Sequence, residues 1–207
     1  MESLATLFGA RLTQGSLGAD PQSPPTSLGG ISLRVRDSAG VERLAPLLYV
    51  SPSQINFQVP PGTASGDATL EVINAPATVP PVIVPVRNLA PGLFTLPGNR
   101  AAAYAVRVEA DGRQTILTPG DPILLDDRPV FLALYGTGIR NRSSLDKVTC
   151  TIGGKSVPVE YAGPGGGVPG LDQVNVLLTA ALKGNTDGRL VLTLDGVVAN
   201  VVLVDVH

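Results

Sequence analysis

The sequence predicts an all-β protein built from two tandem immunoglobulin-like β-sandwich domains related by internal duplication. The chain has 207 residues, more than the roughly 100–150 of a common single domain. Its 24 glycines and 19 prolines separate many short apolar runs, as turns separate strands. No segment shows an apolar repeat of helical period between capping residues. A single β-barrel is the structural alternative, and the internal repeat argues against it.

The repeat consists of matching segments that occur twice in the same order. SLATLFGARL at 3–12 resembles VFLALYGTGI at 130–139, and each has a glycine directly after an aromatic residue. QINF at 54–57 resembles QVNV at 173–176. The other matches are LYV at 48–50 with EYA at 160–162, LEV at 70–72 with LVL at 190–192, and the alternating valines of 82–86 with those of 202–206. Several matches in one order indicate a duplicated domain, with loops that differ in length.

Turn signals divide each copy into short strands. Gly-Gly at 153–154, Asp-Gly at 111–112 and Asp-Gly at 195–196 each separate two apolar runs, which is the pattern of a two-residue hairpin. Strands at this spacing are typical of sandwiches. We place the first domain at 1–90 and the second at 91–207, the latter with an added hairpin at about 101–118.

Composition limits the partners that the chain can have. The net charge is −2 and charged residues make up 15%, so no electrostatic case exists for nucleic acid or an anionic membrane. No apolar stretch reaches the roughly 18 residues of a membrane span. The first residues lack a basic region and an apolar run, so we expect no signal peptide in this chain. The protein is then either cytoplasmic or a piece of a longer one.

The residue types needed for catalysis and metal binding are scarce, so we expect no enzyme, no cofactor and no metal. His207 is the single histidine, which leaves a catalytic triad without its base. Cys150 is the single cysteine, so no intrachain disulfide can form, and its alternating strand favours a place in the core. Asp121, Asp126 and Asp127 share one loop; we interpret it as a solvated loop, with calcium binding as the alternative.

The Gln-x-Asn motif is the most informative polar feature. On a strand, Gln54 and Asn56 share one face, and Gln173 and Asn175 do the same in the second copy. These amides can form a polar outer face over an apolar core, bond the backbone of the preceding loop, or contact a ligand. Aromatic residues are 4% and tryptophan is absent, which disfavours a carbohydrate platform.

Three stretches carry a family resemblance: LYVSPSQINFQVP, APGLFTL and YAGPGGGVPGLDQVNV. They are similar to the uncharacterised C-terminal domain abundant in Solibacter and other Acidobacteria, which ends large secreted proteins. The strand ending in Phe-Gly also resembles the start of IPT/TIG immunoglobulin-like domains. The resemblance implies an extracellular module, secreted or on the cell surface, and transfers no catalytic residue. The chain departs from the family pattern at 119–130.

These observations favour a non-catalytic structural or interaction module that displays, spaces or adheres. Its expected partners are other protein domains or copies of itself, paired through β-strand edges. The alternative is a subunit of an extracellular filament joined through terminal or edge strands, and a carbohydrate-binding module is a lesser one. Prolines guard the strand at 82–86, whereas 197–206 and 4–8 have no such guard. The strand at 197–206 is therefore either covered within its own sheet or used to pair with a neighbour. If the protein assembles, we expect a terminal strand to form the joint.

Overall fold

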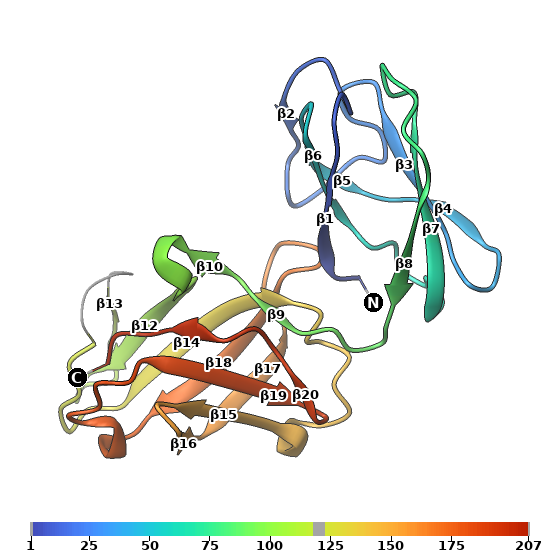
Figure 1. The fold of residues 1–207 in the computed structure, drawn as a ribbon. Helices are drawn as coiled ribbons and strands as arrows, with labels where there is room; N and C mark the ends of the chain where they lie inside the picture. The colour runs from blue at the N-terminus through green and yellow to red at the C-terminus, as the bar shows by residue number, and fades with distance from the viewer. Residues whose placement is uncertain (1, 118–122, 207) are drawn as a thin grey trace. The chain divides into compact units, whose positions relative to one another are not determined.

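The computed structural model describes residues 2–117 and 123–206, and it is built from β-sheets whose strands pair antiparallel except at one parallel pair in the second unit (Figure 1). In the described residues, helical structure is limited to three 3-10 turns: η1 (Pro97–Asn99), η2 (Leu145–Lys147) and η3 (Ala180–Leu182). None of these described helices is long and apolar enough to cross a membrane. The all-β sandwich prediction is confirmed.

The chain divides into two compact units, one of residues 1–88 with 166–170 and one of 89–165 with 171–207. The division at 88/89 lies beside the boundary expected at 90. Each unit has its own cluster of buried apolar side chains, which is the property that defines a domain.

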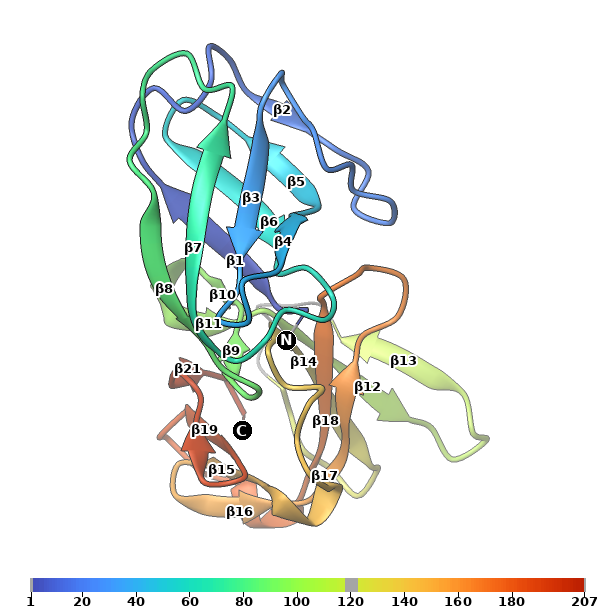
Figure 2. The same ribbon diagram turned by 90° about the vertical axis from the view of Figure 1, so that its right-hand side faces the viewer.

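The first unit has two four-stranded sheets. One has the order β1 (Leu4–Phe8), β6 (Gln54–Gln58), β5 (Leu47–Val50), β2 (Leu17–Gly18). The other has the order β4 (Glu42–Leu44), β3 (Ser32–Arg36), β7 (Gly66–Ile73), β8 (Val82–Val86). The two sheets form the layers of a sandwich in Figure 2.

Alternation along the strands makes the core of the first unit. Ile55 and Phe57 on β6 are buried, as are Leu33 and Val35 on the facing β3. They belong to one apolar cluster, because every second side chain of a strand points to the same face of its sheet.

The second unit has larger sheets of the same kind. One has the order β13 (Gln114–Leu117), β12 (Ala103–Val108), β14 (Val130–Thr137), β18 (Asp172–Leu178), β17 (Val159–Pro164), with β9 (Gly92–Leu93) paired to the end of β14. The other has the order β10 (Thr95–Leu96), β11 (Arg100–Ala101), β21 (Val202–Leu203), β19 (Arg189–Leu194), β15 (Val148–Ile152), β16 (Lys155–Val157), with β20 (Val197–Val198) paired to β19. Leu132 and Val174 of the first sheet and Cys150 and Leu192 of the second lie in one buried cluster.

The two units share one strand order. The neighbours β1, β6 and β5 correspond to β14, β18 and β17, and β4, β3, β7 and β8 correspond to β16, β15, β19 and β21. The register agrees as well, since Phe8 lies opposite Gln54 and Tyr135 lies opposite Gln173. The segments matched in the sequence thus lie on equivalent strands. Common ancestry of the units stays a prediction.

The C-terminal strand differs from the expectation of one unguarded strand at 197–206. Two short strands form there, and β21 lies between β19 and β11. Val202 and Val206 are buried, because this segment completes the core of its own unit. The described part of this segment is therefore covered within its own sheet, whereas β1 at the other end of the chain is an edge strand.

Candidate functional site

The Gln-x-Asn amides of each unit lie on the outer face of a sheet. Gln54 Nε2 donates to Asn56 Oδ1 at 2.6 Å, and Thr6 Oγ1 donates to the same oxygen at 3.0 Å. In the second unit, Gln173 Nε2 donates to Asn175 Oδ1 at 2.7 Å. All four amide side chains are half-buried, which is expected of a polar face above an apolar core.

Aromatic side chains flank each amide pair. The bulge in β5 leaves Tyr49 opposite Asn56, and the corresponding bulge in β17 leaves Tyr161 opposite Asn175. We call each set an amide–aromatic cluster, consisting of Phe8, Tyr49, Gln54 and Asn56 in the first unit and Tyr135, Tyr161, Gln173 and Asn175 in the second. The matched segments of the repeat include these aromatic residues, but the positions of Tyr49 and Tyr161 opposite the amides follow from bulges, which change which residues face each other.

The cluster of the second unit has a further ring, Tyr104 from β12. The Tyr104 and Tyr135 ring centroids are 5.8 Å apart with planes tilted by 46°, and the two hydroxyl oxygens are 3.1 Å apart. Burial, followed by the hydrogen bond to Tyr104, raises the pKa of Tyr135 to about 12. The Tyr135 hydroxyl therefore stays protonated to a higher pH than an ordinary tyrosine does.

The amide side chains of the Gln-x-Asn motifs do not bond the backbone of the loops that precede them. Their hydrogen bonds go to each other's side chains, while Ser51 N donates to Gln54 O at 2.8 Å and Gly165 N donates to Leu171 O at 2.8 Å to close those loops. Gln58, two residues after Asn56 on β6, differs from Gln54 and Asn56: it is buried, and its Nε2 donates to the backbone oxygen of Glu2 at 3.5 Å.

A buried ion pair fixes the turn after β14. Asp172 is fully buried and accepts hydrogen bonds from Ile139 N at 2.7 Å and from Arg140 Nε at 2.7 Å. Gly138 in this turn has φ of 71°, and Arg11 at the corresponding place of the first unit has φ of 55°. The pair therefore holds a turn that needs a left-handed residue.

A second buried carboxylate serves the first unit. Asp37 accepts hydrogen bonds from Ala64 N at 3.0 Å, from Val41 N at 2.9 Å and from Arg43 Nη1 at 2.7 Å. These bonds, led by the one from Ala64, hold the pKa of Asp37 at about 2. Asp37 thus stays ionised and ties two loops together.

The other residues that the sequence analysis considered for catalysis or metal binding are buried, lie beside a basic side chain, or fall outside the described residues. Cys150 is 2% exposed in the core, and burial raises the pKa of its thiol to about 12. Asp126 is bonded to Arg128, and Asp127 lies 3.8 Å from Lys183. His207 and Asp121 lie outside the described residues. Within residues 2–117 and 123–206, no group of three His, Cys, Asp or Glu side chains is placed to hold a metal.

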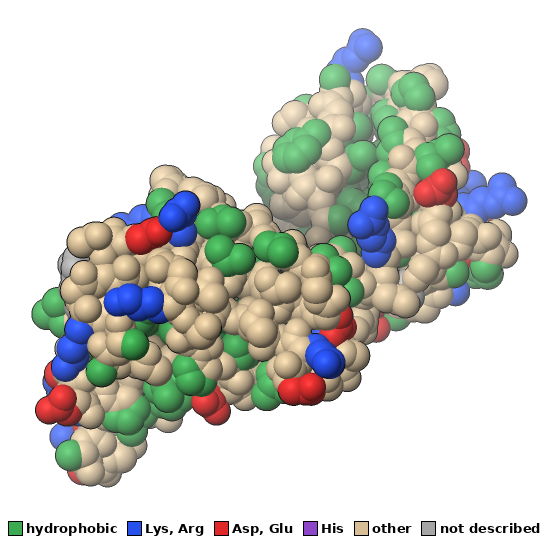
Figure 3. Space-filling model, turned by 60° about the horizontal axis from the view of Figure 1, so that its bottom comes forward, with side chains coloured by type: hydrophobic (Ala, Val, Ile, Leu, Met, Phe, Trp, Pro, Cys, Tyr) green, Lys and Arg blue, Asp and Glu red, His purple; other side chains and the backbone are tan. Residues whose placement is uncertain are grey.

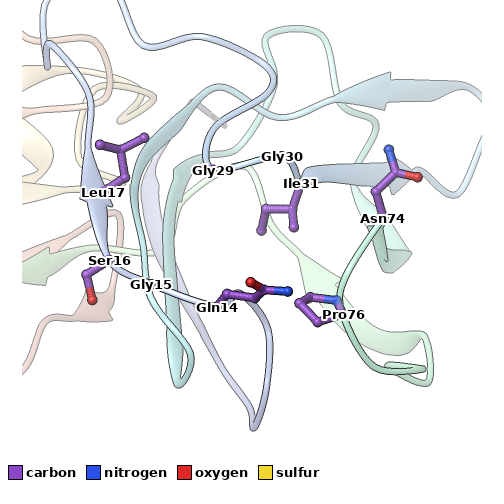
Figure 4. A pocket seen from close by; sticks show the side chains of 9 residues that line it. All are labelled: Gln14, Gly15, Ser16, Leu17, Gly29, Gly30, Ile31, Asn74 and Pro76. Carbon is purple, nitrogen blue, oxygen red and sulfur yellow. The ribbon is translucent and has the colours of Figure 1, made fainter.

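Shallow pockets lie at the loops of each unit. One of about 480 Å³ in the first unit is lined by loops 14–17, 29–31 and 74–76. In Figure 4 the Gln14 amide lies between Ile31 and Pro76, and no charged residue lines this pocket. One of about 500 Å³ in the second unit includes Asp187, whose carboxylate is paired with Arg189 at 2.6 Å.

Charged side chains are dispersed on the face of the molecule in Figure 3, where several of opposite sign are neighbours.

Comparison of the chain with protein-family models, with curated protein sequences and with solved structures gives no match.

Proposed function

We propose that this chain is a non-catalytic structural or interaction module of an extracellular bacterial protein, which spaces, anchors or displays other domains. One observation carries the proposal: the buried polar side chains hold backbone. Asp37 and Asp172 each bind two or more backbone N–H groups, and the Cys150 thiol is enclosed by apolar neighbours. Such groups make a sandwich rigid, which a spacer or anchor needs.

The repetition of one strand order in two units supports the same function. Duplication of an immunoglobulin-like sandwich lengthens a spacer by one domain for each copy added. The amide–aromatic clusters add a repeated outer surface on equivalent strands. Tyrosine and amide side chains suit protein contacts, because an apolar ring and a hydrogen-bonding group occur together.

A carbohydrate ligand is the second candidate, favoured by one feature of the second unit. Tyr104, Tyr135 and Tyr161 lie on the outer face of one sheet beside Gln173 and Asn175. Rings next to amides can stack on a sugar and bond its hydroxyls. Binding of the purified chain to a glycan array that Tyr135→Ala abolishes would establish this function, and an array without signal would exclude it for the glycans tested.

Immunogold electron microscopy of intact cells of the native bacterium tests the proposed location and role. Antibody raised against the folded chain should label the outside of unpermeabilised cells. Gold confined to the cell interior after sectioning would contradict an extracellular module. Gold in rows along fibres would favour the filament form of the proposal.

A further inference from the structure

Each of the four described sheets has two edge strands. Two of these eight edge strands lack the usual protection against pairing with another chain. Native edges are kept from pairing by short length, charge or proline. The protected strands carry these features: two residues only in β2 and β10, Glu42 and Arg43 in β4, Pro85 in β8, Lys155 in β16, and Glu160 and Pro164 in β17. In contrast, β1 (LATLF) and β13 (QTIL) contain no charge and no proline.

The open edge of β1 is formed by the backbone of Thr6 and Phe8. Gly9 N donates to Ser53 O, and Val59 N donates to Ser3 O, so the odd residues of β1 bond to β6 and the even ones point outward. Among the described residues, no hydrogen-bond partner lies on this outer side at Thr6 and Phe8. The Phe8 side chain is 74% exposed.

The corresponding edge in the second unit is occupied by another segment of this chain. Tyr135, the counterpart of Phe8, donates its N–H to Ala102 O at 3.1 Å and accepts from Phe94 N at 2.9 Å. Ala133, the counterpart of Thr6, lies opposite Tyr104 of the antiparallel β12. An edge of this type thus accepts an antiparallel strand of this chain, whose one charged residue, Arg107, lies opposite Val130.

The chain offers a second open edge that fits the first. Glu109 N donates to Arg113 O, so the odd residues of β13 bond to β12, and Gln114 and Ile116 point their backbone groups outward. The Ile116 side chain is 67% exposed. Strand β13 forms the outermost strand of its sheet in Figure 2.

We propose that β13 of one copy of the chain pairs with β1 of a second copy, antiparallel, with Thr6 opposite Ile116 and Phe8 opposite Gln114. In this register Ile116 lies diagonal to Phe8, as Tyr104 lies diagonal to Tyr135. The joint covers both exposed apolar side chains and continues the sheet. This inference rests on the proposed function, since it names the partner of an interaction module.

The joint uses two different surfaces, so each copy can bind one neighbour at each edge. A heterologous contact of this kind makes a ring or an open row of copies. Strand addition supplies backbone hydrogen bonds, but the pairing of two residues on each side is short. We therefore expect weak, concentration-dependent association of the free chain, strengthened where copies are held close together on a surface.

Sedimentation velocity of the full chain over a range of concentrations tests the joint. The unaltered chain should form dimers and larger species at high concentration, whereas Phe8→Lys and Ile116→Lys should each stay monomeric. Ile83→Lys is the matched control, because Ile83 is 72% exposed on the proline-guarded β8, and it should behave as the unaltered chain. An unaltered chain that remains monomeric up to about 1 mM would overturn the proposal.

Mixing the two variants distinguishes this joint from self-pairing of one edge. Phe8→Lys retains β13 and Ile116→Lys retains β1, so an equimolar mixture should give dimers and no larger species. Assembly lost in Phe8→Lys and retained in Ile116→Lys would instead indicate pairing of β1 with β1, which would overturn the proposed joint.

Oxidative cross-linking tests the register. A chain with Thr6→Cys and Ile116→Cys should form covalent multimers, since directly opposite residues lie within disulfide reach. Ile83→Cys with Ile116→Cys is the control and should form no covalent multimers; the buried Cys150 thiol is common to both. Equal cross-linking of the two pairs would overturn the register. A failed joint leaves surface labelling by immunogold unaffected, so the two proposals can fail separately.

Discussion

Arg140 and Asp172 form an ion pair in which Nε donates to Oδ1 at 2.7 Å while the carboxylate is fully removed from solvent. The same carboxylate accepts from the backbone N–H of Ile139, and Arg140 Nη2 donates to Leu171 O at 2.8 Å. One buried pair therefore joins the turn after β14 to the start of β18.

Arg140→Ala should strongly destabilise the second unit. It leaves the Asp172 carboxylate buried without its cation, and such a loss costs about 3–5 kcal/mol. Urea unfolding followed by circular dichroism measures it. Arg113→Ala is the control, because its partner Asp111 is half-exposed and the change should stay below about 1 kcal/mol. Equal effects of the two substitutions would contradict the assigned role.

Asp37 should make the first unit sensitive to acid. Its pKa is about 2 in the folded state against an ordinary value of 3.8, so the folded state favours the ionised form. The stabilisation is complete above pH 4 and is lost as the pH falls from about 4 through 2. Thermal melts across this range should show a decline that Asp37→Asn reduces. A decline of the same size in Asp37→Asn would assign the acid sensitivity to other carboxylates.

Asn56→Ala and Asn175→Ala should each cost about 0.5–1.5 kcal/mol, the net value of an ordinary hydrogen bond. The effect is modest because the amides are half-buried and bond to side chains rather than to buried backbone. The loss in Asn56→Ala should exceed that in Asn175→Ala, since Asn56 also accepts from Thr6. Chemical denaturation of the two variants gives the comparison, and a loss above about 3 kcal/mol would indicate a buried role.

Gly138→Ala should destabilise the second unit, whereas Arg11→Gly should not destabilise the first. At Gly138 the backbone has φ of 71° and an added Cβ would overlap the Ala90 carbonyl oxygen, so alanine should cost about 1–3 kcal/mol. At Arg11 the φ of 55° strains a residue with a side chain, so glycine should be neutral or stabilise by about 1 kcal/mol. Destabilisation by Arg11→Gly of the same size as that by Gly138→Ala would contradict the strain argument.

The sequence predicted the architecture well, because strand alternation and turn residues are local signals. The matched Gln-x-Asn segments lie on equivalent strands with their amides outward, and Ile55 and Val174 lie in the cores. The sequence of 197–206 left open whether this strand is covered within its own sheet or pairs with a neighbour, because its partner β11 comes from a segment about 100 residues earlier in the chain. The positions of Tyr49 and Tyr161 opposite the amides depend on bulges, and the Arg140–Asp172 pair is a contact between residues 32 positions apart in the chain. Neither leaves a local pattern.

Labelling of lysines on intact cells tests the central claim, an extracellular module, most directly. Lys147, Lys155 and Lys183 are all exposed in the folded chain, so an amine reagent that cannot cross membranes reaches them only from outside. Mass spectrometry of the chain from unbroken native cells should show these lysines modified to nearly the same extent as after lysis, with a cytoplasmic protein unlabelled. Modification that appears only after lysis would contradict the account.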